Sequence, residues 1–317
     1  MQRAVTPVDA KSAYGWIMSF NDNVQLDPSR VSDRRGRGRG AAVGGGVGGG
    51  LLLILSLIFG PGVVDELGLD DGTGTTQEQG PAGGAISACR SGADANEQLD
   101  CRILATAESL DSFWVPTLEQ VGVTYTQPGV VLFSGRENTG CGTATSAVGP
   151  FYCPADEQTY YDTAFFDDLV TRFGASSGPL AQEYVVAHEF GHHIQNLIGT
   201  LGAAQQDPQG AESGGVRVEL QADCLAGMWA AHAVSVPDPE SGEPFLRPFS
   251  DTDLRDALSA AASVGDDRIQ ESMTGQVDPE GWTHGSSAQR QAWFSQGYET
   301  GDLASCDTFA ATDLDRP

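Results

Sequence analysis

The segment His188-Glu189-Phe190-Gly191-His192 most restricts what this chain can fold into. Two histidines four residues apart can bind one metal ion if the segment is a helix, because they then lie on one face, a turn apart. Glu189 would border the open coordination position of that metal. The chain has five histidines in 317 residues, and three of them, including His193, fall here. We therefore interpret the motif as a hydrolytic zinc site rather than a surface helix with a chance pattern.

Residues 179–197 have the pattern of a largely buried amphipathic helix. Apolar residues recur at intervals of three and four, Pro179 stands at the start, and Gly199 follows the end. Gly191 costs this helix about 1 kcal/mol relative to alanine, so we expect it to allow close packing near the metal. His193 points about 100° away from the histidine pair, which predicts a structural role.

A catalytic zinc ion needs a third protein ligand, and the helical stretch 213–234 offers two carboxylates. Glu219 and Asp223 are four residues apart and share a face. In so acidic a chain such a pair is usually a solvated helix face, but the flanking residues here are largely apolar, and burying unpartnered carboxylates is costly. We therefore predict that Glu219 binds the metal and that Asp223 accepts the free ring N–H of a ligand histidine.

These residues resemble zinc peptidases of the gluzincin type, in which His-Glu-x-x-His is followed by Glu-x-x-x-Asp on the next helix. More closely, the chain is similar to a bacterial family named putative neutral zinc metallopeptidases, whose members have a short basic N-terminus, a glycine-rich membrane segment and one extracytoplasmic domain. The similarity extends from Asp33 to about Phe309, and its motifs are Asp33-Arg34-Arg35-Gly36, Ser146-Ala147-Val148-Gly149-Pro150-Phe151-Tyr152-Cys153-Pro154, His188 to His193, Glu219 to Cys224 and His284-Gly285-Ser286-Ser287-Ala288-Gln289-Arg290. It implies a zincin-like α+β fold, a small sheet plus the active-site helix and following helices, and peptidase chemistry.

The expected reaction is peptide-bond hydrolysis with one Zn²⁺ per chain. Zinc lowers the pKa of a bound water toward about 7, and Glu189 would accept its proton and pass it to the leaving amine. His284 precedes a helix predicted to begin near Ser286, and related gluzincins place a histidine downstream as the oxyanion donor. Alternatively His284 caps that helix or bonds a loop carbonyl. Arg290 is either a rival donor or a residue that orients Glu219 or Asp223.

The segment Ser146-Ala147-Val148-Gly149-Pro150-Phe151-Tyr152 resembles the edge strand that gluzincins place above the active site, and we expect Ser146, Ala147, Val148 and Gly149 to contact the substrate. An extended peptide substrate could add there as an extra strand. The alternative is an interior strand with a structural role, tied down by Cys141 and Cys153. Bulky replacement of Ala147 or Gly149 tests the idea, because it should impair peptide cleavage while zinc stays bound.

Charge is distributed unevenly along the chain. The formal net charge is −26, yet residues 1–60 hold seven Lys or Arg against four Asp. Strong acidity beyond residue 60 argues against a nucleic-acid partner and favours a cationic or unstructured protein substrate, although acidity that serves only solubility accounts for it equally well. The chain is long enough for one substantial domain.

We expect four regions: a basic cytoplasmic tail (1–39), a transmembrane or signal-anchor segment (40–60), a flexible acidic, glycine-rich linker (61–85) and an extracytoplasmic catalytic domain (86–317). The protein would then be a single-pass membrane protein. A cleaved signal peptide is the alternative, because the strongly apolar core of the segment is only nine residues long. Met18 is an alternative start.

Other patterns predict helices over 101–122, 164–173, 251–264 and 287–297 and strands over 129–133 and 159–161, which together indicate an α+β domain. Six cysteines fit an exported protein and can pair in chain order as Cys89–Cys101, Cys141–Cys153 and Cys224–Cys306, one of fifteen possible arrangements. A cysteine zinc site is disfavoured, since no Cys-x2-Cys spacing occurs. Two other functions stay open: an exported metal-binding scaffold or binding protein without turnover, and a cell-wall peptide amidase. Oligomeric state is left open.

Overall fold

The two helices that carry the predicted metal ligands are present in the computed structural model, which describes residues 19–35 and 86–317. The first is α6 (Pro179–Ile198), with Pro179 in its first turn and Gly199 ending it at φ 84°, in the left-handed region that favours glycine. The second is α8 (Gly214–Ala233), whose N-cap Ser213 accepts a hydrogen bond from the Val216 N–H. Both predicted ranges are confirmed to within one residue at each end.

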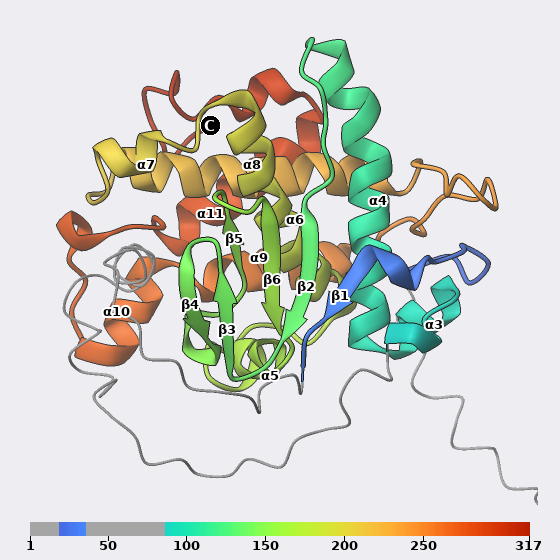
Figure 1. The fold of residues 1–317 in the computed structure, drawn as a ribbon. Coiled ribbons are helices and arrows are strands. Elements are labelled where there is room, and N and C mark those ends of the chain that lie inside the picture. Colours follow the sequence, from blue (N-terminus) through green and yellow to red (C-terminus); the bar gives the residue numbers. More distant parts are fainter. Residues whose placement is uncertain (1–18, 36–85) are drawn as a thin grey trace, which may run out of the picture.

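The structure is a mixed α+β arrangement, as the sequence predicts (Figure 1). Its other helices are α3 (Gly92–Glu97), α4 (Leu99–Gln120), α5 (Ala164–Thr171), α7 (Ala203–Gln206), α9 (Asp251–Ser263), α10 (Asp266–Thr274) and α11 (Ser287–Thr300). Its strands are β1 (Val31–Asp33), β2 (Gly129–Phe133), β3 (Arg136–Thr139), β4 (Gly142–Thr145), β5 (Phe151–Cys153) and β6 (Gln158–Asp162). Four of these strands form one sheet in the order β1-β2-β6-β5, and β3 and β4 form a separate hairpin.

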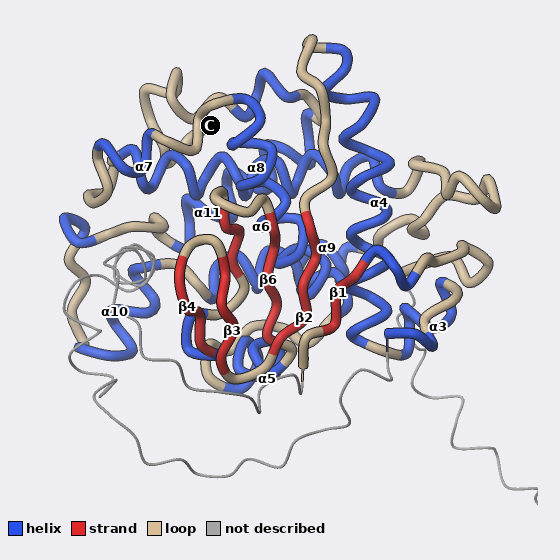
Figure 2. Tube along the Cα trace, in the orientation of Figure 1, coloured by secondary structure: helices blue, strands red, loops and turns tan. Residues whose placement is uncertain are grey.

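The four-stranded sheet lies between the helices and the hairpin, as Figure 2 shows for the strands in red. Strands β1, β2 and β6 are parallel, and β5 is antiparallel to β6 at the edge. Side chains alternate between the two faces of a strand. Val130 and Leu132 of β2 accordingly pack into the main core with the helices, whereas Val131 and Phe133 pack with Ala144 of the hairpin.

Close approach of helix backbones fixes the positions of α6, α8 and α11. A Cβ atom at Gly191 of α6 would lie 3.0 Å from the backbone of Ala222 on α8, which confirms the predicted packing role of this glycine. A Cβ at Gly297 of α11 would lie only 1.9 Å from the carbonyl oxygen of Cys224, which is too short for two non-bonded atoms, so only glycine fits there. The backbone of α8 therefore lies against both neighbouring helices.

All six cysteines form disulfides, and the pairing is the one predicted. Cys89–Cys101 joins the start of the main segment to α4, and Cys141–Cys153 joins the β3–β4 turn to β5. Cys224–Cys306 ties the C-terminal segment to α8, one residue after Asp223.

Residues 19–35 belong to the folded domain, so the predicted start of the domain at residue 86, and the assignment of residues 19–35 to a separate tail, are wrong. Strand β1 pairs with β2 over Val31↔Val130 to Asp33↔Leu132, and Phe20 forms a bridge with Leu246. Among the described residues, no helix is long and apolar enough to cross a membrane. The predicted membrane segment 40–60 and linker 61–85 lie outside the described residues.

The predicted edge strand covers only the last part of the segment expected for it. Ser146–Val148 form a 3₁₀ turn, and Gly149 follows at φ 74°, which takes it out of extended conformation. The strand begins only after Pro150, as β5, which lies at one edge of the sheet, while β1 lies at the other. The prediction of an extended segment is therefore wrong over residues 146–149 and confirmed at Phe151 and Tyr152.

Candidate metal centre

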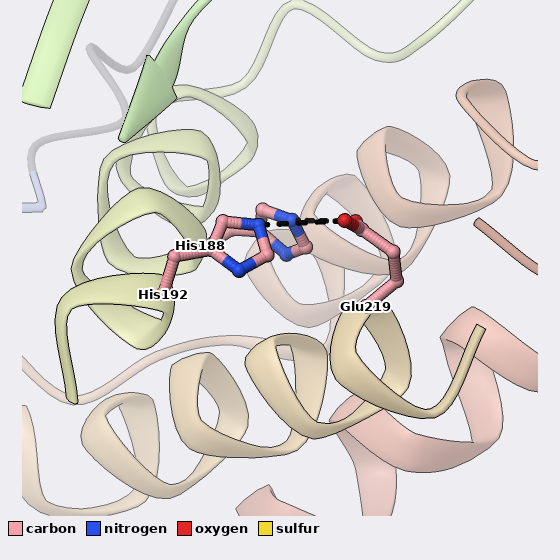
Figure 3. A group of neighbouring side chains, drawn as sticks. All are labelled: His188, His192 and Glu219. Atoms are coloured by element: carbon pink, nitrogen blue, oxygen red, sulfur yellow. Dashed lines mark hydrogen bonds and ion pairs between the residues drawn. The ribbon is translucent and has the colours of Figure 1, made fainter. Parts of the chain in front are cut away.

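Two imidazoles and one carboxylate converge between α6 and α8. The rings of His188 and His192 stack edge to face with centroids 4.8 Å apart, as expected one turn apart on a helix. Glu219 reaches across from α8, with Oε2 3.2 Å from His188 Nε2 and Oε1 3.6 Å from His192 Nε2. Figure 3 shows the three side chains pointing toward one another, and one ligand atom from each lies within 4.8 Å of the others.

The other ring nitrogen of each histidine is already engaged. His188 Nδ1 lies 2.9 Å from Asp223 Oδ1, and His192 Nδ1 lies 2.8 Å from Gln195 Oε1. An Nδ1–H that donates to an oxygen leaves the Nε2 lone pair free for a metal, which is the usual arrangement around zinc-binding histidines. Two imidazole nitrogens and a carboxylate also form a donor set that zinc prefers in catalytic sites. The residues therefore fit a zinc ion.

Asp223 is held by a buried network that the sequence analysis anticipated only in part. Arg290 of α11 donates to both carboxylate oxygens, at 2.8 Å from Nε to Oδ2 and 3.0 Å from Nη2 to Oδ1. Tyr184, one turn before His188 on α6, donates its hydroxyl to Oδ1. Burial alone would raise the pKa of Asp223, but attraction to Arg290 and His188 lowers it below its usual value. Arg290 thus orients Asp223, one of its two predicted roles.

Glu189 lies beside the ligand histidines in a buried position, 7% exposed. Burial raises its pKa above the usual value, and the charges of His192 and His188 act against that rise. A carboxylate whose pKa is raised is a stronger proton acceptor than one in water, which suits a general base. The role of Glu189 as general base stays a prediction, and the raised pKa is compatible with it.

His284 is close enough to the metal centre for its charge to interact with that of Glu219, and a residue that the sequence analysis missed holds it in place. Asp266, the first residue of α10, accepts hydrogen bonds through Oδ2 from the N–H groups of Thr283, His284 and Gly285, at 2.6–3.0 Å. Its Oδ1 lies 3.2 Å from His284 Nδ1. Burial alone would lower the pKa of His284, but attraction to Asp266 and then Glu219 raises it. Nε2 has no partner among the described residues, so it is free to donate.

Nothing in the sequence around Asp266 marks it as a site residue. It is one of 43 acidic residues in the chain, and its partner His284 lies 18 residues further on. Tyr184 could have been found, since it precedes His188 by four residues and shares its helix face. His284 is not itself the helix cap, because Ser286 caps α11 and completes a capping box with Gln289.

His193 has the structural role predicted for it. Its Nε2 lies 2.6 Å from the carbonyl oxygen of Thr126, and its Nδ1 lies 3.0 Å from the hydroxyl of Tyr152 in β5. An Nε2–H donating to Thr126 leaves Nδ1 to accept from Tyr152. Asn196 also donates to the Tyr152 hydroxyl, at 3.1 Å. The metal-site helix is thereby attached to the edge strand.

The arrangement defines a class of protein: a mixed α+β domain with a two-histidine, one-carboxylate site of the kind that holds zinc. Comparison with known proteins agrees with that class. The chain belongs to the family described as "Putative neutral zinc metallopeptidase", whose profile matches residues 19–309.

Relatives of the chain are found in several bacteria. It is 54% identical over 302 residues to an uncharacterised protein of Mycobacterium tuberculosis, covering 94% of this chain and 100% of that protein. It is 39% identical over 295 residues to the uncharacterised protein YpfJ of Escherichia coli, covering 89% of this chain and 96% of that protein. No solved structure matches significantly.

Proposed function

We propose that this protein is a zinc-dependent metalloendopeptidase with a zincin-like fold of the gluzincin type. One observation carries the proposal: His188 and His192 of α6 and Glu219 of α8 bring three ligand atoms within 4.8 Å of one another, and Glu189 follows His188 on α6. The ligand side chains keep 9%, 13% and 19% of their surface exposed, so the site can be reached from outside. Membership of the zinc metallopeptidase family supports the same function.

Each residue has a defined task in this reaction. Zinc, when bound, would act as a Lewis acid that activates a water and polarises the scissile carbonyl. Glu189 accepts the proton of the attacking water and delivers it to the leaving amine. His284, held by Asp266, donates from Nε2 to the oxyanion that forms on the substrate. Asp223 and Arg290 keep His188 turned so that its Nε2 faces the metal.

We propose that an extended peptide binds along β5. Within residues 19–35 and 86–317, this strand pairs only with β6, so its other edge has backbone groups that a peptide can pair with. The hydrogen bonds of Tyr152 to His193 and Asn196 hold β5 against the metal-site helix. The segment Ser146, Ala147, Val148 and Gly149 leads into this strand, and its contact with substrate stays a prediction.

Two other functions are distinguished from peptide hydrolysis by the experiment described below. A metal-binding scaffold without turnover needs neither Glu189 nor an oriented His284, so the Asp266–His284 pair favours an enzyme. A cell-wall amidase would use the same centre on a different amide. The net charge of −26 supports a protein substrate over nucleic acid. We also propose an extracytoplasmic location, supported by the three disulfides.

Zinc analysis of the purified protein and digestion of a diverse peptide library test the proposal together. We expect about one zinc per chain and cleavage within peptides that stops on chelation and returns when zinc is added. Zinc binding without cleavage of any peptide would exclude the peptidase and support the metal-binding scaffold. Cleavage confined to cell-wall peptides would identify the amidase.

A further inference from the structure

The N-terminal segment 19–35 is built into the catalytic domain rather than lying beside it. Strand β1 extends the sheet in parallel next to β2, with Val31, Ser32 and Asp33 paired to Val130, Val131 and Leu132 (Figure 1). The N–H of Arg34 continues the ladder by donating to the carbonyl oxygen of Leu132 at 2.8 Å. A backbone ladder of this kind forms only between segments in direct contact.

Side chains of this segment fill positions in the core. Phe20 and Val24 are fully buried, and Leu26 and Val31 are 6% exposed. Ser19 donates its hydroxyl to Glu183 of α6, five residues before the first metal ligand. The segment therefore contributes to the support of the metal-site helix.

Three arginines of the same segment form ion pairs with the rest of the domain at separate positions. Arg30 pairs with Asp111 of α4 at 2.7 Å, and Arg34 pairs with Glu137 of β3 at 2.9 Å. Arg35 pairs with both Asp33 and Asp100, at 2.6 Å and 2.7 Å. These arginines belong to the basic run that suggested a cytoplasmic tail, but in the fold their charges are neutralised by carboxylates of the domain.

Residues 25–26 also contact residues 90–91 directly. The N–H of Leu26 donates to the carbonyl oxygen of Arg90 at 3.1 Å, and Gln25 forms a bridge with Ser91. Residues on the two sides of the 36–85 range are thus hydrogen-bonded to each other. A membrane cannot separate residues that are hydrogen-bonded to each other.

We infer that residues 19–35 and 86–317 occupy the same side of any membrane with which the chain associates. A single crossing between them, as predicted for 40–60, would place β1 and β2 in different compartments and is incompatible with their pairing. Any crossing between residues 36 and 85 must be matched by a return. The arginines of residues 30–35 therefore lie on the same side as the rest of the domain. This inference is independent of metal binding and of activity.

Thiol labelling of the full chain in spheroplasts tests the inference. Ser32→Cys and Ser272→Cys each introduce one exposed thiol, one in β1 and one in α10, while the six native cysteines stay paired in disulfides. A membrane-impermeant maleimide should label both variants equally before permeabilisation. Labelling of both only after permeabilisation would support the shared side and overturn the extracytoplasmic location. Labelling of the two on opposite sides would overturn the inference.

A cross-link tests the strand pairing itself. Ser32 and Val131 are register partners, so Ser32→Cys combined with Val131→Cys should form a fourth disulfide, seen as a linked peptide by mass spectrometry. The matched control combines Ser32→Cys with Val130→Cys, because Val130 faces the other side of the sheet and should stay unlinked. Absence of the Ser32–Val131 link, together with labelling of position 32 on the side opposite to position 272, would show that β1 does not join the sheet.

Discussion

Hydrogen bonds from neighbouring side chains set the orientation of the two histidines in the metal centre. Asp223 and Gln195 each engage the Nδ1 of one histidine, so both rings present Nε2 to the same point. The histidine pair and both acids on α8 could be predicted from spacing alone. Arg290 could be given only two alternative roles, because Asp223 lies 67 residues from it, and the contact of Asp266 with His284, 18 residues away, could not be predicted at all.

Replacing Arg290 by lysine should weaken zinc binding while leaving a buried positive charge. Lysine cannot donate to both oxygens of Asp223 in the planar geometry that arginine provides, so the orientation of His188 would be lost. We expect zinc affinity to fall roughly 10 to 100-fold, measured by competition with a chelator. Arg30→Lys is the matched control, since Arg30 forms a comparable pair with Asp111 away from the metal. Equal zinc affinity in all three proteins would exclude the proposed role of Arg290.

Replacing Asp266 by asparagine should change how activity depends on pH. Asp266 raises the pKa of His284 above the usual value, so His284 stays protonated to higher pH and can donate from Nε2 as a cation. In Asp266→Asn that pKa falls, and the alkaline limb of kcat should move to lower pH with zinc content unchanged. His284→Phe should lack this limb and lower kcat by about 100 to 1,000-fold. An alkaline limb that stays in place in Asp266→Asn would contradict the pairing.

Helices with clear start and stop residues, and the apolar strands β2 and β6, were the elements that could be predicted. Segments such as α6 and α8 have caps and apolar periodicity, which are local signals. Strand β1 has three residues and pairs with β2 almost 100 residues later, and nothing local reveals that partner. The hairpin of β3 and β4 is largely polar because only one of its faces packs on the sheet, so it lacks an apolar run.

Helix α6 carries a fully buried carboxyl, that of Glu183. Burial raises its pKa to about 7, against the opposing effects of Arg102 and Ser19. The folded protein therefore binds this proton more tightly than the unfolded chain does, and its contribution to stability is present at low pH and lost as pH rises through about 7. Glu183→Gln cannot ionise, so its Tm should fall less between pH 6 and pH 8 than that of the parent.

Differential scanning calorimetry across this pH range measures the effect. Burial also raises the pKa of Glu108, to about 8, which contributes in the same direction in both proteins. The difference between the two Tm profiles therefore reports Glu183 alone. Profiles that run parallel from pH 6 to pH 8 would show that Glu183 does not titrate in this range.

For the molecule as a whole, the N-terminal boundary of the domain determines which truncated chains can fold. Phe20, Val24, Leu26 and Val31 are buried, and each contributes roughly 1.5–3 kcal/mol. Together these contributions approach the whole stability of a typical domain, about 5–15 kcal/mol. A chain that begins at residue 86 should therefore fail to unfold cooperatively, whereas one that begins at Ser19 should keep the Tm of the full chain. Equal Tm values for the two truncated chains would show that residues 19–35 are dispensable.

The central claim is that α6 and α8 form a hydrolytic zinc centre in which Glu189 acts on water and Glu219 on the metal. Zinc content and peptide cleavage measured side by side in Glu189→Gln and Glu219→Ala test it most directly. We predict that Glu189→Gln retains about one zinc per chain and loses cleavage, while Glu219→Ala loses both. Loss of zinc in Glu189→Gln, or full zinc occupancy in Glu219→Ala, would contradict the assignment.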